Sequence, residues 1–262
     1  TEIKKENKYF AVDILKENKN YIFSLDYLLK PEKLSFNEKN SREIFFLQAT
    51  ATGKGLYKTN YYETSSLELP IKNITAYCLS NNSVFWLNDD GFLNQSDLSG
   101  NNPAVLNEKP LSSRENNGFE IKILPGQKIF LNSENGLYFL NSDNGVFEKI
   151  LNRINDLSLS PDSKNIYFFD NYEIWIADEL LEKIVFLSRF SQKIKNNFWL
   201  NSDYLIFNVE EKIKISEIDN RDRINIVEVG KFENPKIFWS KNHGTLYVLS
   251  KSNLYHLENI IP

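Results

Sequence analysis

Histidine, the side chain that acid–base catalysis uses most often, is rare in this sequence. The 262-residue chain has two histidines, His243 in a turn-like segment and His256 inside an apolar run. Both are interpreted as structural or solvent-exposed. A Ser-His-Asp triad can be assembled from residues far apart in sequence, but the Gly-X-Ser-X-Gly motif of a hydrolase nucleophile elbow is missing. We therefore predict no catalytic residue and no enzyme.

Paired carboxylates are the second chemistry to consider, because a glycosidase needs two of them facing each other across a sugar. Six aspartates stand in polar segments between apolar runs: Asp89, Asp90, Asp97, Asp143, Asp162 and Asp170. Aspartate is common in turns because its side chain caps the backbone, and this interpretation is favoured. A carboxylate-based hydrolase, or a glycan-binding protein, stays open as the alternative.

Metal and cofactor sites have little support in the sequence. Cys78 is the only cysteine, so neither an internal disulfide nor a cysteine metal cage can form. It lies in an apolar run and is predicted to be buried and unreactive. The Asn- and Asp-rich turns lack the spacing of a calcium loop, and no glycine-rich phosphate loop is present. We predict no metal and no cofactor.

Charge and hydropathy exclude two classes of partner. The chain has 31 basic and 35 acidic residues and a net charge of −4, without long blocks of one sign. A nucleic-acid-binding domain usually has a basic stripe, so no nucleic acid is expected. No apolar run approaches the length of a membrane-spanning helix. The chain begins at Thr1 and not at Met, so we expect that a segment was removed.

The elements that must position any site follow from an internal repeat. Six apolar or aromatic runs recur about forty residues apart, each bounded by Asn, Asp, Ser or Gly. They are Glu43–Leu47, Ser83–Leu87, Lys128–Leu131, Asn165–Phe169, Tyr204–Phe207 and Thr245–Leu249. One apolar stretch precedes each run and one or two follow it. Four short strands in a forty-residue unit predict the blade of a β-propeller.

We predict an all-β fold, a single β-propeller domain over residues 1–262 with six four-stranded blades. The expected blades cover about 31–70, 71–110, 118–151, 154–190, 194–231 and 234–262. The six runs should form the second strand of each blade. Residues 178–188 could also be an amphipathic helix, but the repeat favours a turn followed by an outer strand.

Closure of the ring is expected to involve residues 1–30. The last unit ends at Pro262 without room for a fourth strand, which would leave an open sheet edge. Two N-terminal runs, Tyr9–Leu15 and Tyr21–Leu25, have no blade of their own. One of them should pair beside Leu254–Leu257. If both pair with further strands, a seventh, partial blade is the alternative.

The loops that lead into the innermost strands are the predicted binding surface, since propellers commonly bind there. They provide basic and amide side chains for a protein or glycan partner. The candidate residues are Lys72, Asn73, Asn117, Arg153, Asn155, Arg189, Lys195 and Asn234. Basic groups on one rim of an acidic protein suit an anionic partner, although solvated turn residues remain the alternative.

Several segments resemble a known group of propellers. Ser160–Phe169 resembles the Ser-Pro-Asp-Gly-Lys turn of TolB-like and WD40-like propellers. Asp170–Ile176, Leu187–Ser191 and Lys212–Arg223 are similar to the propeller that follows PEGA domains in bacteria of the candidate phyla radiation. This resemblance implies a protein anchored to the bacterial envelope with its propeller outside the cytoplasm, and it implies no known activity. The complete repeat and the missing catalytic constellation favour a non-catalytic interaction module or scaffold.

Overall fold

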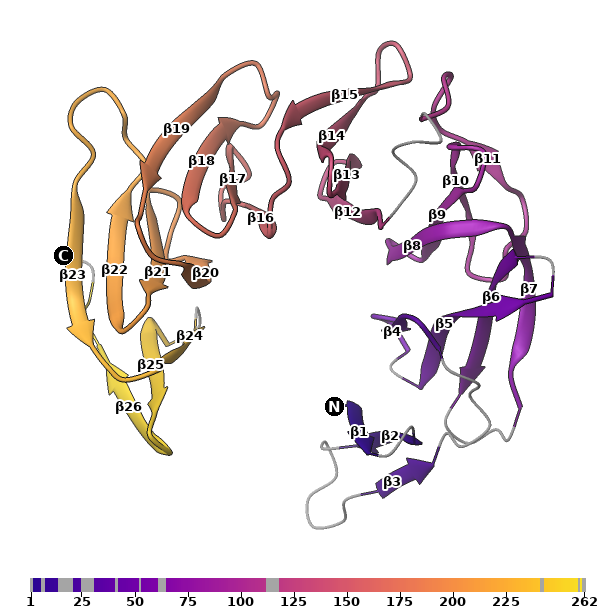
Figure 1. Cartoon of the computed structure of the whole chain (residues 1–262), viewed down its shortest axis with the longest axis horizontal. Helices are drawn as coiled ribbons and strands as arrows, with labels where there is room; N and C mark the ends of the chain where they lie inside the picture. Colours follow the sequence, from indigo (N-terminus) through magenta and orange to yellow (C-terminus); the bar gives the residue numbers. More distant parts are fainter. Residues whose placement is uncertain are drawn as a thin grey trace. The chain divides into compact units, whose positions relative to one another are not determined.

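The computed structural model describes residues 2–5, 8–13, 21–24, 31–40, 42–51, 53–60, 65–111, 118–240, 243–258 and 260. Regular structure in these residues is entirely β-strand, in antiparallel sheets (Figure 1). They contain no helix that could cross a membrane. The all-β prediction is confirmed. The chain divides into two compact units, residues 1–123 with 127–152, and residues 124–126 with 153–262, which are described separately.

Unit 1 contains three four-stranded sheets in which strands consecutive in sequence pair. The first comprises Leu34–Phe36 (β4), Glu43–Thr50 (β5), Gly53–Asn60 (β6) and Leu67–Lys72 (β7). The second comprises Ile74–Ser80 (β8), Ser83–Asn88 (β9), Leu93–Asp97 (β10) and Ala104–Val105 (β11). The third comprises Glu120–Leu124 (β12), Lys128–Ser133 (β13), Gly136–Asn141 (β14) and Val146–Leu151 (β15).

Unit 2 contains two four-stranded sheets and one of three strands. The first comprises Asp156–Leu159 (β16), Asn165–Phe169 (β17), Glu173–Asp178 (β18) and Ile184–Arg189 (β19). The second comprises Ile194–Trp199 (β20), Tyr204–Val209 (β21), Lys212–Glu217 (β22) and Ile226–Lys231 (β23). The third comprises Lys236–Ser240 (β24), Thr245–Ser250 (β25) and Asn253–Leu257 (β26).

All six repeated runs lie in the second strand of their sheet, as predicted. The ambiguous residues 178–188 form the end of β18, a turn and most of β19, which confirms the strand interpretation. Leu181 in this turn has φ 60°, a left-handed backbone that would not fit a right-handed helix.

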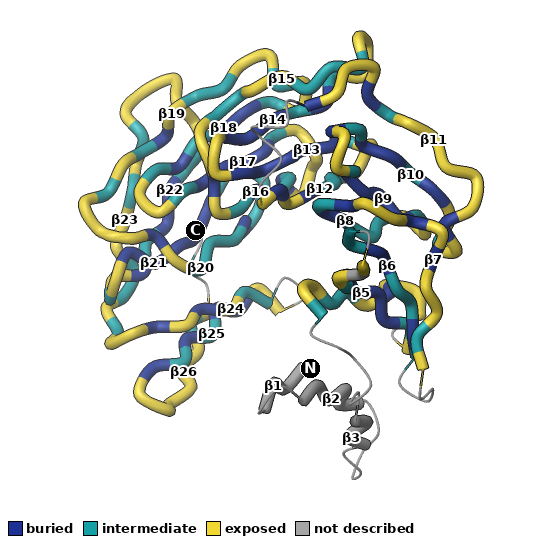
Figure 2. Tube along the Cα trace, turned by 45° about the vertical axis from the view of Figure 1, so that its right-hand side comes forward, coloured by how far each residue is buried: buried dark blue, intermediate teal, exposed yellow. Residues whose placement is uncertain are grey.

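The repeated runs are mainly apolar, and in β9 and β21 the reason is that the sheet is covered on both faces. In β9, Val84 and Trp86 belong to a core shared with β5–β8, whereas Phe85 and Leu87 belong to a core shared with β12–β14. Successive side chains of a strand point to opposite faces, so one strand supplies two cores. In Figure 2 the buried stretches follow β9, β13, β17 and β21, and the outer strands β11 and β23 carry exposed residues.

Unit 2 repeats this arrangement. In β21, Leu205, Phe207 and Val209 pack toward β17–β19, and Ile206 packs toward β24 and β25. The next residue on the second face, Asn208, is also fully buried. The core between these sheets therefore ends in a buried amide.

Polar contacts join neighbouring sheets at their innermost strands. The Tyr77 hydroxyl on β8 donates to the carbonyl oxygens of Phe45 (2.8 Å) and Lys33 (3.2 Å). In unit 2, Trp199 Nε1 on β20 donates to the Ser158 carbonyl oxygen on β16 (3.2 Å). Each contact satisfies a buried donor while it ties one sheet to the preceding one.

Cys78 is only partly buried, so the prediction that it is buried was wrong. It occupies β8 and packs at the margin of the core that contains Phe85 and Leu87. Burial still raises the pKa of its thiol, which favours the unreactive protonated form.

The N-terminal strands Glu2–Lys5 (β1), Lys8–Asp13 (β2) and Tyr21–Ser24 (β3) form a separate sheet in the order β1-β2-β3. Both predicted N-terminal runs thus pair with other strands, which is the condition stated for a seventh, partial blade. β26 pairs with β25, and no fourth strand is assigned to its sheet among the described residues. Closure by an N-terminal strand stays a prediction, as does the number of blades.

Candidate functional site

The structure divides the predicted binding residues between the two units. Lys72 and Asn73 belong to unit 1, and Asn117 lies outside the described residues. Lys72 Nζ lies 3.7 Å from Glu68 Oε1. Asn73 has φ 54°, and its carbonyl oxygen accepts from the backbone N–H of Asp89 (2.8 Å). Both residues shape the connection between β7 and β8.

Three predicted residues flank the first sheet of unit 2. Asn155 Nδ2 donates to Asn171 Oδ1 (3.0 Å), so an amide ahead of β16 and an amide between β17 and β18 form a pair. Arg189 Nε lies 3.6 Å from Glu173 Oε1 at the end of the same sheet. Arg153 is exposed ahead of β16. These side chains are held mainly by their own sheet.

Lys195 and Asn234 are brought together in one pocket of unit 2, with a volume of about 700 Å³. The pocket lies where β20, the β21–β22 turn and the loop into β24 meet. Its lining residues are Lys195, Asn196, Asn208, Glu210, Glu211, Asn234, Pro235 and Lys236. We call it the asparagine pocket, after the three asparagines among them.

A β-bulge in the innermost strand positions one of these asparagines. Lys195 pairs with Asn208, but the next pair joins Phe198 to Ile206, so two residues of β20 stand opposite one of β21. One of the two, Asn196, has φ 43°. The other, Asn197, keeps a buried Oδ1 without a hydrogen-bond partner among the described residues. Bulges re-aim side chains beside functional sites, and here the distortion is accompanied by an unsatisfied acceptor.

Asn208 lines the pocket and hydrogen-bonds to two other lining residues, Asn196 and Glu210. Its Oδ1 accepts from Asn196 Nδ2 (2.8 Å), and its Nδ2 donates to the carbonyl oxygen of Glu210 (3.1 Å). Because Asn208 is fully buried, loss of either contact would leave a polar atom without water or partner. The amide of Asn196 is thereby fixed in orientation, and its Oδ1 has no partner among the described residues.

Three residues around the pocket have a left-handed backbone: Asn196 (φ 43°), Glu210 (φ 51°) and Asn234 (φ 45°). Asparagine adopts this conformation with little penalty, whereas most other residues avoid it. Glu210 is therefore the strained member, in a two-residue turn between β21 and β22. Such strain clusters at binding sites.

The charges at the pocket are only partly paired. Glu211 Oε2 lies 3.5 Å from Lys231 Nζ, just outside the lining. Lys195, Lys236 and Glu210 are exposed, and none of them forms an ion pair with another described residue. The pocket therefore offers two free ammonium groups, one free carboxylate and neutral amides.

Sequence reasoning missed Asn196, Asn208 and Lys236. Asn196 stands one repeat after Asn155, so the periodicity that revealed the strands could also have revealed this amide. Asn208 lies inside the apolar run of β21, and Lys236 follows Pro235 at the start of β24. Neither position has a local signal, because only the stacking of two sheets makes them pocket residues.

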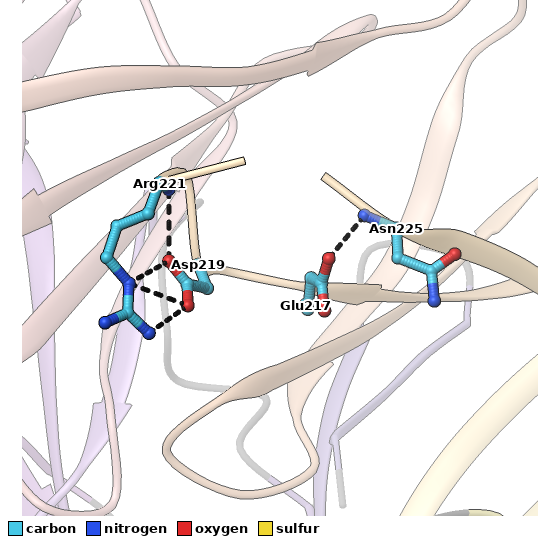
Figure 3. Close-up of polar contacts among 4 residues, drawn as sticks. All are labelled: Glu217, Asp219, Arg221 and Asn225. Atoms are coloured by element: carbon cyan, nitrogen blue, oxygen red, sulfur yellow. Dashed lines mark hydrogen bonds and ion pairs between the residues drawn. The ribbon is translucent and has the colours of Figure 1, made fainter. Parts of the chain in front are cut away.

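The other end of the same sheet has a different character. A second pocket of about 400 Å³ is lined by Asp203, Tyr204, Glu217, Ile218 and Asp219. Figure 3 shows that two of its three carboxylates are hydrogen-bonded: Arg221 donates to both oxygens of Asp219, at 2.6–3.1 Å, and Glu217 accepts from the backbone N–H of Asn225 (2.7 Å). Hydrogen bonds from Arg221 lower the pKa of Asp219 to about 2.

No observation on the described residues favours the alternative of a carboxylate-based hydrolase. It requires converging carboxyl groups, one of them with a raised pKa. Four described carboxyl groups have a shifted pKa, and in all four the pKa is lowered: Glu43, Asp162, Asp219 and Glu228. In Glu43 burial raises the pKa, but hydrogen bonds and the charge of Lys58 outweigh it. No group of three potential metal-ligating side chains occurs in the described residues.

Comparison with solved structures defines the fold. The designed protein Ika8 matches with a TM-score of 0.60 at 13% identity, covering 98% of this chain and 85% of its own. YCF48 bound to a D1 peptide matches with a TM-score of 0.55 at 13% identity, covering 95% and 87%. YCF48 from Cyanidioschyzon merolae matches with a TM-score of 0.54 at 9% identity, covering 95% and 90%.

These neighbours are β-propellers, so the chain has a propeller fold, as the repeat predicted. No protein-family model and no curated protein matches the sequence. At these identities the likeness establishes the fold alone. Function must be argued from the site.

Proposed function

We propose that this chain is a non-catalytic interaction module that binds a protein partner by taking an extended peptide segment into the asparagine pocket. The observation that carries the proposal is the pair Asn196–Asn208. A fully buried amide fixes a second amide whose Oδ1 faces no protein partner. A preorganised polar group of this kind fixes a ligand's orientation.

Amide side chains suit a peptide because they provide the same donor and acceptor groups as its backbone. Asn234 has no side-chain hydrogen bond within the described residues, so both its Oδ1 and its Nδ2 are available. An extended segment presents alternating N–H and C=O groups, which Asn196 and Asn234 can contact from neighbouring sheets. The volume of about 700 Å³ lies within the range of pockets that bind small ligands.

The structural neighbours support a peptide ligand. YCF48, which shares the propeller fold, is known with a bound D1 peptide. A propeller of comparable length can therefore accommodate a peptide. A protein partner is favoured over a glycan, which would leave the pocket's unpaired charges without a counterpart.

The test is selection of random linear peptides displayed on phage against the full chain, followed by calorimetric measurement of Kd. Asn196→Ala and Asn234→Ala should each weaken binding about fivefold, the effect of one lost neutral hydrogen bond. Asn220→Ala, on an exposed loop at the other end of the sheet, is the matched control and should bind as the unchanged protein does. Failure to select any binding peptide, or equal affinity in all variants, would refute the proposal.

We also propose that the protein works outside the cytoplasm, attached to the bacterial envelope, on the basis of the resemblance of Asp170–Ile176, Leu187–Ser191 and Lys212–Arg223 to PEGA-associated propellers. The full-length precursor tests this idea. A membrane anchor or PEGA domain ahead of Thr1 would support it, and a precursor that starts directly at the propeller would contradict it.

For the ring itself, we propose six four-stranded blades, with Tyr21–Ser24 (β3) as the outer strand beside β26. β2 is paired on both sides by β1 and β3, so of the two predicted runs only β3 has a free edge. The alternative is a seventh blade made of β1–β3.

A further inference from the structure

The two free lysines of the asparagine pocket point to the chemistry of its ligand. Lys195 is in β20 and Lys236 is the first residue of β24, the innermost strands of neighbouring sheets. Both line the same pocket. Two ammonium groups in one cavity repel each other, and an anion placed between them would be stabilised by both.

Neither lysine forms an ion pair with a described carboxylate, although Glu210 and Glu211 line the same pocket. Glu211 is engaged by Lys231, and Glu228 Oε2 lies 2.9 Å from Lys212 Nζ. Lys212 and Lys231 thus form ion pairs, whereas Lys195, and Lys236 on the neighbouring sheet, form none with the described residues. In a chain with net charge −4, two unpaired cations in a pocket are a specific feature of this site.

We propose that the asparagine pocket recognises a carboxylate of the bound peptide, held jointly by Lys195 and Lys236. This inference rests on the proposed peptide-binding function and specifies its ligand. The carboxylate comes from an Asp or Glu side chain or from the C-terminus of the peptide, since both present the same group.

The remaining polar groups limit the ligand further. Glu210 lines the pocket and has no ion-pair partner among the described residues, so it repels a second anion. The pocket should therefore favour a peptide with a single carboxylate at this point over a run of acidic residues. At the opposite end of the sheet, the pocket of Asp203, Glu217 and Asp219 repels anions, so a carboxylate is directed to the lysine end.

The experiment uses a selected peptide and two neutral derivatives, one with its Asp or Glu replaced by Asn or Gln and one with an amidated C-terminus. If the proposal holds, one of the two derivatives binds about tenfold or more weakly, as expected for a lost hydrogen bond to a charged group. The derivative that loses affinity identifies the source of the carboxylate.

The lysines are tested with the same peptides. Lys195→Gln and Lys236→Gln should each weaken binding of the charged peptide, and the neutral derivative should bind these variants and the unchanged protein alike. Lys183→Gln, an exposed lysine ahead of β19, is the control and should have no effect. Unchanged urea midpoints would show that the variants fold. A Lys236→Glu variant should regain affinity for a peptide that carries Lys in place of its acidic residue.

Two outcomes separate this inference from the proposed function. Peptides that bind equally well with and without their carboxylates would overturn the inference and leave peptide binding intact. Failure to select any peptide would overturn both.

Discussion

At the scale of single residues, the asparagine pocket combines a strained turn with a buried amide. Glu210 adopts φ 51°, a conformation that Asn or Gly would occupy more easily. A residue that costs stability and also lines a pocket is typical of a site whose side chain serves binding. Its neighbour Asn208 shows the reverse, since a polar residue inside an apolar strand is tolerated only because both its amide atoms are bonded.

Replacing Glu210 with Asn should therefore stabilise the protein. The expected gain in the free energy of unfolding is about 0.5–1 kcal/mol, a part of the penalty for a left-handed non-glycine residue. Urea denaturation measures it. Glu211→Asn is the control, because Glu211 is not left-handed and loses its ion pair with Lys231. A loss of stability in Glu210→Asn would contradict the strain argument.

The Asp219–Arg221 fork predicts a pH dependence. The pKa of Asp219 is lowered to about 2 in the folded state, below the ordinary value of about 3.9. A lowered carboxyl pKa stabilises the folded state above the ordinary value, and this contribution is lost as pH falls through about 4 toward 2. Because both side chains are exposed to solvent, the effect on unfolding is small, and NMR titration of the carboxyl carbon is the better measurement.

Arg221→Ala should raise the pKa of Asp219 back toward its ordinary value, because the donors that stabilise the carboxylate are gone. Arg223→Ala, two residues along the same loop, is the matched control and should leave the Asp219 titration near 2. An unchanged titration in Arg221→Ala would show that the fork is not formed in solution.

At the scale of strands and sheets, two innermost strands, β8 and β20, are each tied to the preceding sheet by an aromatic donor. Tyr77 on β8 and Trp199 on β20 both reach backbone carbonyl groups across a sheet interface. Apolar packing holds stacked sheets together without fixing how far one slides over the next. A hydrogen bond to a defined carbonyl fixes that register.

Tyr77→Phe should destabilise the protein by about 1–2 kcal/mol, because the Phe45 carbonyl oxygen loses a buried donor while the ring volume is kept. Thermal or urea unfolding measures the change. Tyr172→Phe is the control, since Tyr172 is 39% exposed in a turn, and should alter stability by less than about 0.5 kcal/mol. Equal effects in the two variants would assign no special role to the contact between the sheets.

At the scale of the whole molecule, ring closure depends on what pairs with β26, the edge strand of the last sheet. Among the described residues, β26 has a paired neighbour on one side only, and an unprotected edge is a liability that folded proteins cover. Leu254 and Tyr255 of this strand are 65% and 43% exposed. Both features are expected of a strand that pairs with a further strand on its open side.

Deleting residues 1–30 should lower the melting temperature by about 5 °C or more, equivalent to roughly 2 kcal/mol at this chain length. It should also remove hydrogen-exchange protection from the outward amides of Leu254–Leu257, if β3 pairs there. Deleting residues 1–7 alone removes β1 and should leave that protection in place. Fast exchange of these amides in the complete chain would favour β1–β3 as a separate seventh blade. If the protein without residues 1–30 melts within a degree or two of the full chain, both the six-blade and the seven-blade closure are wrong.

The sequence by itself determined the strands, their order and the propeller class. Each repeated run has a continuous apolar or aromatic stretch, such as Val84–Leu87 or Ile166–Phe169, bounded by polar residues, and that local pattern indicates a buried strand. The spacing of the runs then specified how strands group into sheets. These properties depend on neighbours in sequence and on repetition.

Only the tertiary structure decided where the pocket lies. Lys195 and Asn234 were candidates because they lie in predicted loops. The sequence around Asn208 predicts only a core strand, and no residue near Asn196 predicts the bulge there. The pocket exists because two sheets stack and the apolar core between them ends at Asn208, the next residue after Ile206 on that face of β21. That boundary is set by side chains from β20, β21 and β24 together. Contacts between distant segments create it, so no single segment of sequence encodes it.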